Sequence, residues 1–364
     1  MLKVCIIGCG MIANSAHIPA YKRFEADFTV EAVSDVNGDS ARETAQRHNI
    51  DKWFDDAERM LCECRPDLVS VCVPNCFHKE YVMLALKYGA NVLCEKPLAF
   101  TKRDVCEMFA CAKERGRTLM ACQSMRYTPD RLAAKKYIEE CGEDSFYYTE
   151  LSRVRRRGIP YWGAFHIGRI SGGGAFADIG IHMIDAAIWL TRNTEVLSVC
   201  GVALKNHVDE LGDLSKSGAL TGHVDSMRKF DPDEMDVEDF GAGCVRFKNG
   251  AVMNFKVAWA ANQPEEASLK LVGRKIGINI PECKVFSGAD GVEAIEGISL
   301  KYGETFAGHV YLVENMRDVL ICGDEPAVKP EETVACAEIT EAFYRSARLG
   351  REVFVDELQS NRPF

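Results

Sequence analysis

The sequence predicts two domains, an α/β domain followed by an α+β domain. At 364 residues the chain is too long for one ordinary domain. Its first third alternates short apolar runs with amphipathic runs of helical period, which is typical of a parallel sheet covered by helices on both faces. The remainder reads as strands in series followed by helices, which is typical of an α+β domain. We expect the domains to comprise residues 1–124 and 125–364.

The expected elements of the first domain alternate along the chain. The strands are at 2–7, 29–34, 68–73, 91–94 and 118–121, and the helices between them are at 40–48, 79–88 and 101–115. Each strand is short and apolar throughout, as in a sheet buried on both faces. Pro19 should break the helix that follows the first strand, or else begin a second short helix.

The second domain is expected to be rich in strands. Its helices are predicted at 129–140, 175–190, 309–321 and 330–349, with strands at 145–154 and in succession over 195–287. The pair Asn249-Gly250 lies between apolar runs and predicts a hairpin. The polar stretch 205–236 is expected to be a long loop, with a turn at its Asp-Pro pair.

Composition restricts the class of protein. A net charge of −10 argues against nucleic acid and anionic membranes as partners, because both need a basic surface. No apolar run approaches the roughly 18–20 residues that span a bilayer. The apolar start of the chain is too short for a secretory signal and leads directly into a glycine loop. We therefore expect a cytoplasmic protein.

The sixteen cysteines are expected to be reduced thiols that mostly behave as small buried apolar residues. No Cys-x-x-Cys pair occurs in the sequence, so the spacing predicts neither a zinc site nor a redox pair. The alternative is a metal held by Cys62 with Cys64, or by Cys72 with Cys76.

A glycine motif follows the first strand directly. The run Gly8-Cys9-Gly10-Met11-Ile12-Ala13 fits G-x-G-x-x-G/A, in which the second glycine lets the backbone approach a pyrophosphate at a helix N-terminus. Asp35 follows the second strand, where a carboxylate accepts hydrogen bonds from a ribose diol and repels a 2′-phosphate. This spacing predicts a Rossmann domain that prefers NAD to NADP. The alternative is a structural turn with an incidental aspartate.

Two further motifs lie at the ends of later strands. They are Val73-Pro74-Asn75-Cys76-Phe77-His78 and Cys94-Glu95-Lys96-Pro97-Leu98. Ligands of open α/β sheets bind at the carboxyl ends of the strands, so we expect both motifs to border the cofactor. The alternatives are a helix-start residue for His78 and an ordinary surface lysine for Lys96.

A glycine triplet, residues 172–174, leads into a polar stripe on an apolar helix. Asp178 and His182 are four residues apart and share one helix face, which Asp185 continues. Polar groups on such a helix are costly to bury without a purpose. An aspartate beside a histidine can orient the imidazole for proton transfer. The alternative is a satisfied buried pair that serves structure only.

In this order, the motifs resemble those of the Gfo/Idh/MocA family (glucose–fructose oxidoreductase, inositol dehydrogenase and rhizopine catabolism). The resemblance extends from Met1 to about Trp259. It implies a Rossmann domain and a second domain with a large open, mostly antiparallel sheet. It also implies a homo-oligomer, dimer or tetramer, built through that sheet, and an active site between the domains. Lys96, Asp178 and His182 match the family's catalytic lysine, aspartate and histidine.

A basic cluster is formed by Arg153, Arg155, Arg156 and Arg157. By itself it suits a solvated turn, or a site that binds a phosphate or a carboxylate. The resemblance implies that the loop containing it reaches the nicotinamide end of the cofactor, where Trp162 would stack. It also implies that residues 126 and 127 face the substrate.

The resemblance implies hydride transfer between NAD(H) and a ring carbon of a sugar, glycoside or cyclitol, with C3 favoured. His182 would be the general acid/base, assisted by Lys96 and Asp178. The alternatives are an NAD-dependent glycosidase that oxidises the sugar transiently, and a non-catalytic NAD(P)-binding regulator. The expected cofactor contacts are Gly8, Gly10, Met11, Ile12, Ala13, Asp35, Pro74, Asn75, His78, Glu95, Lys96 and Trp162, and the expected substrate contacts are Lys96, Arg126, Tyr127, Asp178 and His182.

Overall fold

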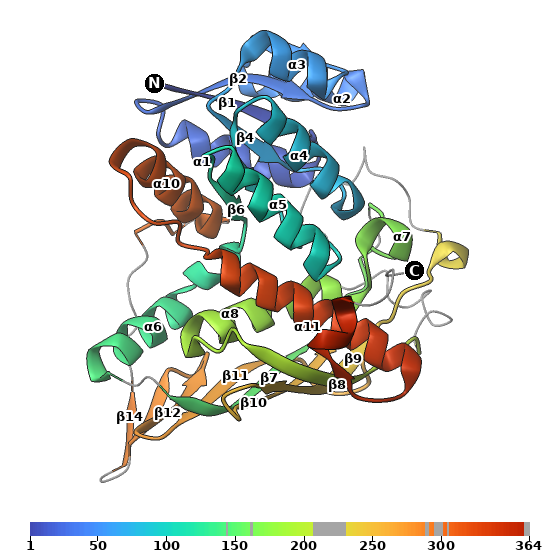
Figure 1. The fold of residues 1–364 in the computed structure, drawn as a ribbon, viewed down its shortest axis with the longest axis vertical. Coiled ribbons are helices and arrows are strands. Elements are labelled where there is room, and N and C mark those ends of the chain that lie inside the picture. Colours follow the sequence, from blue (N-terminus) through green and yellow to red (C-terminus); the bar gives the residue numbers. More distant parts are fainter. Residues whose placement is uncertain are drawn as a thin grey trace. The chain divides into compact units, whose positions relative to one another are not determined.

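The computed structural model describes residues 1–142, 145–160, 163–206, 231–287, 291–294, 301–303 and 306–359 (Figure 1). The chain divides into two compact units. The first comprises residues 1–99, 103–124 and 302–333, and the second comprises residues 100–102, 125–301 and 334–364. Among the described residues, no helix has the length and apolar character needed to cross a membrane.

The first unit is built on a six-stranded sheet with the order β3-β2-β1-β4-β5-β6. All five strand pairings are parallel. The strands are β1 (Leu2–Ile7), β2 (Phe28–Ser34), β3 (Lys52–Phe54), β4 (Leu68–Val71), β5 (Asn91–Cys94) and β6 (Leu119–Ala121). This order reverses between β1 and β4, the place where doubly wound sheets bind dinucleotides. The predicted α/β class and Rossmann topology are confirmed.

Helices connect these strands. They are the π-helix η1 (Ala13–His17), α1 (Ile18–Lys22), α2 (Gly38–His48), α3 (Ala57–Cys64), the 3-10 helix η2 (Asn75–Phe77), α4 (His78–Lys87) and α5 (Lys102–Glu114). Side chains cap two of them, because Asn37 accepts from Asp39 N and Ser40 N, and Asp56 accepts from Arg59 N. Pro19 lies in the first turn of α1, so the helix does restart there as the sequence allowed.

The second unit is built on a nine-stranded sheet with the order β14-β13-β12-β11-β7-β10-β9-β8-β15. Its strands are β7 (Phe146–Val154), β8 (Val196–Leu204), β9 (Phe240–Phe247), β10 (Val252–Ala258), β11 (Glu266–Gly273), β12 (Ile276–Ile280), β13 (Lys284–Ser287), β14 (Gly291–Ala294) and β15 (Val353–Phe354). The central pair β7–β10 is parallel, and the remaining pairs are antiparallel. The mostly antiparallel sheet is therefore confirmed.

Helices pack on one face of this sheet (Figure 1). The helices of the second unit include α6 (Pro129–Cys141), α7 (Gly168–Ser171), the π-helix η4 (Phe176–Gly180), α8 (Ile181–Thr191) and most of α11 (Pro330–Leu349); short 3-10 helices are η3 (Ser124–Tyr127), η7 (Pro232–Glu234) and η8 (Val355–Gln359). The core contains Phe176, whose ring stacks on Phe343 at 3.9 Å between centroids and contacts Phe255 at 5.0 Å. This packing fixes η4 and α8 against the sheet.

Two features differ from the sequence prediction. Residues 302–333, which include α10 (Ala307–Cys322), pack with the first unit instead of the second. The reason is long-range contact: α10 packs against η1 and α1, and His309 bonds to a residue at the end of β5. The strand β3 and helix α3 were also not predicted. Of the loop predicted at 205–236, residues 207–230 lie outside the described part of the chain.

Candidate active site

The glycine loop after β1 requires glycine at its first position. Gly8 has φ +95°, and a Cβ on it would lie 2.5 Å from the carbonyl oxygen of Cys72. Gly10 is exposed, and a Cβ there would meet no heavy atom within 4 Å. Ala13 is fully buried, and Met11 and Ile12 are half-buried. The loop is thus packed against the end of β4 at Gly8 and open to a ligand at Gly10.

Asp35 lies at the end of β2, beside this loop. Its Oδ2 accepts from Cys9 N at 2.8 Å, and its Oδ1 accepts from Asn37 N at 2.9 Å. The carboxylate is half-buried and held by backbone N–H groups next to the open glycine. The residues present therefore fit a dinucleotide: Gly10 leaves room for a pyrophosphate, and Asp35 offers a carboxylate for a ribose diol.

The segment that follows β4 contains accessible residues and one buried histidine. Pro74 is exposed and Asn75 is half-buried. His78 is fully buried, with Nδ1 2.7 Å from Pro97 O and Nε2 3.0 Å from Val73 O. Burial lowers the pKa of His78, although both carbonyl contacts oppose this. The side chain of His78 thus joins the loop after β4 to the turn after β5.

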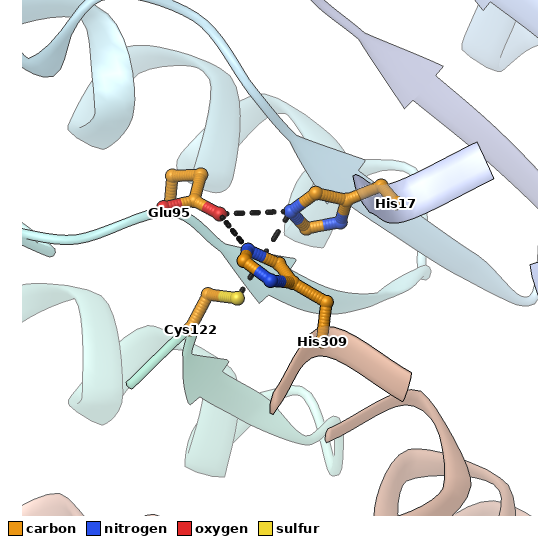
Figure 2. A group of neighbouring side chains, drawn as sticks. All are labelled: His17, Glu95, Cys122 and His309. Carbon is orange, nitrogen blue, oxygen red and sulfur yellow. Dashed lines mark hydrogen bonds and ion pairs between the residues drawn. The ribbon is translucent and has the colours of Figure 1, made fainter. Parts of the chain in front are cut away.

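Glu95 and Lys96 follow β5 directly. The Glu95 side chain is buried, and its Oε1 lies 2.9 Å from His17 Nε2 and 3.1 Å from His309 Nε2 (Figure 2). Its Oε2 accepts from Lys96 N at 3.2 Å. Burial alone would raise the pKa of the Glu95 carboxyl group, but the bonds from the two histidines outweigh it and hold the pKa well below its ordinary value. Glu95 thereby fixes the backbone of Lys96, whose side chain is half-buried.

In the second unit, Asp178 and His182 are the accessible positions at the start of a buried helical run. Asp178 lies in η4 and His182 in the first turn of α8, and both are half-buried between fully buried neighbours. Trp259 is fully buried, and its Nε1 donates to Asp178 Oδ2 at 3.0 Å. The structure therefore places a carboxylate of fixed orientation and an imidazole on one accessible stripe, in a π-to-α transition of a kind often found at functional sites.

Glu238 caps the N-terminus of this helical run. Its Oε2 accepts from Gly174 N at 2.9 Å, and its Oε1 accepts from Phe176 N at 2.9 Å and from the Tyr344 hydroxyl at 3.0 Å. Burial raises the pKa of Glu238, although the backbone donors oppose this. Gly173 and Gly174 are tightly enclosed, because a Cβ on them would lie 1.9 Å from Tyr344 Oη and from Glu238 O respectively. The glycine triplet thus serves close packing around a buried cap.

The remaining predicted site residues, which have weaker support from the sequence, differ from one another in burial and in hydrogen-bond partners. Arg126 is buried, and it donates to both carboxylate oxygens of Asp185 at 2.7 and 2.6 Å. Tyr127 is half-buried. In the basic cluster, Arg155 donates to Gly158 O, and Arg157 donates to Asn262 Oδ1. Trp162 lies outside the described residues.

The sequence interpretation missed four residues that hold the candidate site in place. They are His17, Trp259, Glu238 and His309. Their partners are distant along the chain; 214 residues separate Glu95 from His309. For His17 and His309 the available signal was a histidine within an otherwise apolar segment, which also describes ordinary buried polar residues.

Comparison with known proteins identifies the fold and the family. Residues 2–123 match the model of an oxidoreductase family with an NAD-binding Rossmann fold, GFO_IDH_MocA, and residues 145–279 match the GFO/IDH/MocA C-terminal domain. Together the two models match more than half of the chain.

Similar proteins align with two thirds to nearly all of the chain. D-glucoside 3-dehydrogenase of Escherichia coli is 29% identical over 362 residues, 97% of each chain. The scyllo-inositol 2-dehydrogenase (NADP(+)) of Bacillus subtilis is 28% identical over 66% of this chain and 74% of its own. A levoglucosan dehydrogenase solved with NADH and levoglucosan has a TM-score of 0.79 at 21% identity, over 97% of this chain and 99% of that chain. The chain belongs to the Gfo/Idh/MocA family of NAD-binding oxidoreductases.

Proposed function

We propose that this protein is an NAD-dependent dehydrogenase that oxidises a ring hydroxyl of a sugar, glycoside or cyclitol, with C3 of a glucoside as the favoured position. The observation that carries the proposal is the accessible pair Asp178 and His182, in a chain whose nucleotide-binding residues suit NAD. The D-glucoside 3-dehydrogenase of Escherichia coli, which aligns over 97% of both chains, supports the choice of substrate and carbon.

In the proposed mechanism, His182 removes the proton of the reacting hydroxyl group and returns it in the reverse direction. Asp178 orients His182 and balances its charge, and Trp259 in turn fixes Asp178. The ammonium group of Lys96 stabilises negative charge on the reacting oxygen. NAD(H), when bound, supplies the hydride acceptor or donor.

The cofactor would be held by residues of the first unit. The loop from Gly8 to Ala13 would receive the pyrophosphate, and Asp35 would accept the ribose hydroxyls. We also assign Pro74 and Asn75, which are accessible at the end of β4, to this group. A carboxylate at position 35 disfavours a 2′-phosphate, so we propose that NAD is preferred, whereas the scyllo-inositol 2-dehydrogenase of Bacillus subtilis is named for NADP(+).

The test uses glucosides deuterated at single ring carbons. Oxidation at C3 predicts that deuterium from the C3-labelled substrate, and not from the C2- or C4-labelled ones, appears in the reduced cofactor, together with a primary isotope effect. The preparation is compared with His182→Asn, which keeps a polar side chain but cannot act as the base.

Each outcome has a definite meaning. Label transfer from another carbon would replace C3 but keep the dehydrogenase. Release of the aglycone without net NADH formation would favour the glycosidase alternative. Tight NADH binding with no turnover across sugars, glycosides and cyclitols would contradict the proposal and favour the regulator.

A further inference from the structure

Four buried side chains converge inside the first unit (Figure 2). His17 ends η1, Glu95 follows β5, Cys122 follows β6, and His309 lies in the first turn of α10. Their burial is nearly complete, with side-chain exposures of 0% for His17, 11% for Glu95 and 6% for His309, and Cys122 is 0% exposed. We call this set the HECH cluster. The proposed dehydrogenase mechanism gives it no chemical role.

The potential ligand atoms of the HECH cluster point toward a common centre. Both imidazoles present Nε2 to the same Glu95 Oε1, at 2.9 and 3.1 Å, and the Cys122 sulfur lies 4.0 Å from His17 Nε2. One atom from each of the four residues lies within 4.8 Å of the others. Tetrahedral zinc, with bonds of about 2.0–2.3 Å, needs neighbouring ligand atoms about 3.3–3.6 Å apart. To admit an ion, the pairs at 2.9 and 3.1 Å would have to open by about 0.2–0.4 Å, and the wider pairs would have to close by at most about 1.2 Å.

The chemistry of the four groups is that of a zinc site. Two imidazole nitrogens, one carboxylate oxygen and one thiolate sulfur match the mixed nitrogen, oxygen and sulfur ligands that zinc accepts. Calcium and magnesium instead prefer oxygen ligands. Four protein ligands complete tetrahedral coordination and leave no open position, which is typical of structural sites.

Neighbouring hydrogen bonds orient the ligands. His17 Nδ1 lies 3.1 Å from Ser70 Oγ, which lies 2.7 Å from the Tyr21 hydroxyl, and these three side chains are buried. A partner of this kind on the far nitrogen of a histidine is usual at metal sites, since it turns the other nitrogen to the metal. The second oxygen of Glu95 is occupied by Lys96 N at 3.2 Å, which leaves Oε1 for the centre.

The charge of the HECH cluster also favours a cation. Within the described part of the chain, Glu95 forms ion pairs with His17 and His309, which carry charge only when protonated. Neutral imidazoles satisfy the hydrogen bonds of the buried carboxylate but leave its negative charge unbalanced. A divalent ion would supply that charge and would also balance a Cys122 thiolate.

We propose that His17, Glu95, Cys122 and His309 bind a zinc-class divalent ion at a structural site. The ion would connect α10 to the ends of β5 and β6, and so tie the segment 302–333 to the nucleotide-binding sheet. This inference does not depend on the substrate proposed above.

The test begins with metal analysis of untagged protein purified without chelators and with a non-thiol reductant. We expect a stoichiometric amount of zinc per chain. Removal of the metal by a strong chelator should lower the melting temperature by several degrees, and Zn²⁺ but not Mg²⁺ should restore it. Co²⁺ in place of zinc should show tetrahedral absorption bands together with a thiolate-to-cobalt charge-transfer band.

Variants locate the ion. Cys122→Ser should abolish the charge-transfer band and weaken Zn²⁺ binding at least roughly tenfold, and His309→Gln should weaken it similarly. Cys94→Ser is the matched control: Cys94 is equally buried and directly precedes Glu95, so this variant should bind the ion as the wild type does. Folding of the variants is checked by NADH binding.

Two results would overturn the proposal. One is a metal-free wild-type protein that takes up neither Zn²⁺ nor Co²⁺ at micromolar concentration, which would make the HECH cluster a hydrogen-bonded core. The other is zinc binding that both Cys122→Ser and His309→Gln leave unchanged, which would place the ion elsewhere.

Discussion

At the scale of single residues, the accessible side chains of the candidate site depend on buried partners. Trp259 fixes Asp178, Glu95 fixes the backbone of Lys96, and backbone N–H groups hold Asp35. The sequence could predict the accessible residues, because each follows a strand or a glycine motif. It could not predict Trp259 as the partner of Asp178, or His309 as a partner of Glu95, because these residues lie far apart along the chain and only tertiary packing brings them near.

Asp35 should determine the choice of cofactor. Asp35→Asn keeps an oxygen for the hydrogen bond from Cys9 N but removes the charge that repels a 2′-phosphate. We expect NADH affinity to fall roughly tenfold to a hundredfold and NADPH affinity to rise, as measured by cofactor fluorescence titration. Asp39→Asn, an exposed neighbour at the start of α2, is the control and should change neither affinity. Tighter binding of NADPH than NADH by the wild type would contradict the assignment.

His182 should control turnover without affecting cofactor binding. His182→Ala should lower kcat by roughly 10²–10⁴, the usual contribution of a positioned acid–base group. The rate of oxidation should rise with pH as the imidazole loses its proton, and this rise should be absent in the variant. Trp259→Phe removes the donor to Asp178, so it should reduce kcat less than His182→Ala does and should retain the rise of the rate with pH. A stable His182→Ala enzyme with near wild-type kcat would exclude the residue from the mechanism.

The cysteine thiols should differ in their reactivity according to their burial. Burial raises the pKa of Cys9 to about 12, and it raises the pKa of Cys94 well above its ordinary value. Since the thiolate is the reactive form, these groups should stay inert to a disulfide reagent at about pH 8. The exposed Cys62, Cys106 and Cys322 should react quickly, and all sixteen should react in guanidinium. Rapid labelling of Cys9 or Cys94, detected by mass analysis, would contradict this expectation and show that the segments around these residues open.

At the scale of elements, periodicity located most helices and strands but not their local geometry. The segments β1, β5 and α11 begin and end where the sequence predicted. The π-helices η1 and η4 were not expected, because a single inserted residue hardly alters an apolar period. The strand β3 was missed because it has only three residues, and α3 was missed although its buried residues Ala57, Met60, Leu61 and Cys64 follow a helical period, because it is only eight residues long.

Substitutions of the two glycines in the loop after β1 should have separate effects, one on stability and the other on cofactor binding. Gly8→Ala forces a side chain into positive φ and against Cys72 O, which costs about 1–3 kcal/mol from backbone strain alone and should lower the melting temperature by several degrees. Gly10→Ala meets no neighbour, so its melting temperature should be unchanged. Its methyl group would obstruct the pyrophosphate, and NADH affinity should fall at least roughly tenfold. Equal NADH affinity in Gly10→Ala and wild type would place the pyrophosphate elsewhere.

At the scale of the whole molecule, the sequence identified both fold classes but assigned one terminal helix to the wrong unit. The helix α10 itself was expected near its observed position. Its membership was decided by packing against η1 and α1 and by the bond between His309 and Glu95. Helical periodicity shows that a helix has a buried face, but it does not show which sheet covers that face.

The nine-stranded sheet leaves an apolar area on the face opposite its helices. Cys200, Val202 and Leu204 alternate outward along β8, and Val202 and Leu204 are 50% and 42% exposed. Phe354 on β15 pairs with Ser198 of β8 on the same face and is 46% exposed. Exposed apolar groups gathered on one sheet face are typical of a subunit interface.

We therefore expect a homo-oligomer formed through this face of β8 and β15. Light scattering on the wild type should give a dimer or tetramer at micromolar concentration. The double variant Val202→Lys, Leu204→Lys would bury charges in the interface and should yield folded monomers. Cys200 should be protected in the wild type and should react in the double variant, which links the change to this strand. Ile321→Lys, at a similarly exposed apolar site on α10 of the first unit, should leave the oligomer intact. A wild-type monomer would refute the interface, and an oligomer that survives the double variant would place it on another surface.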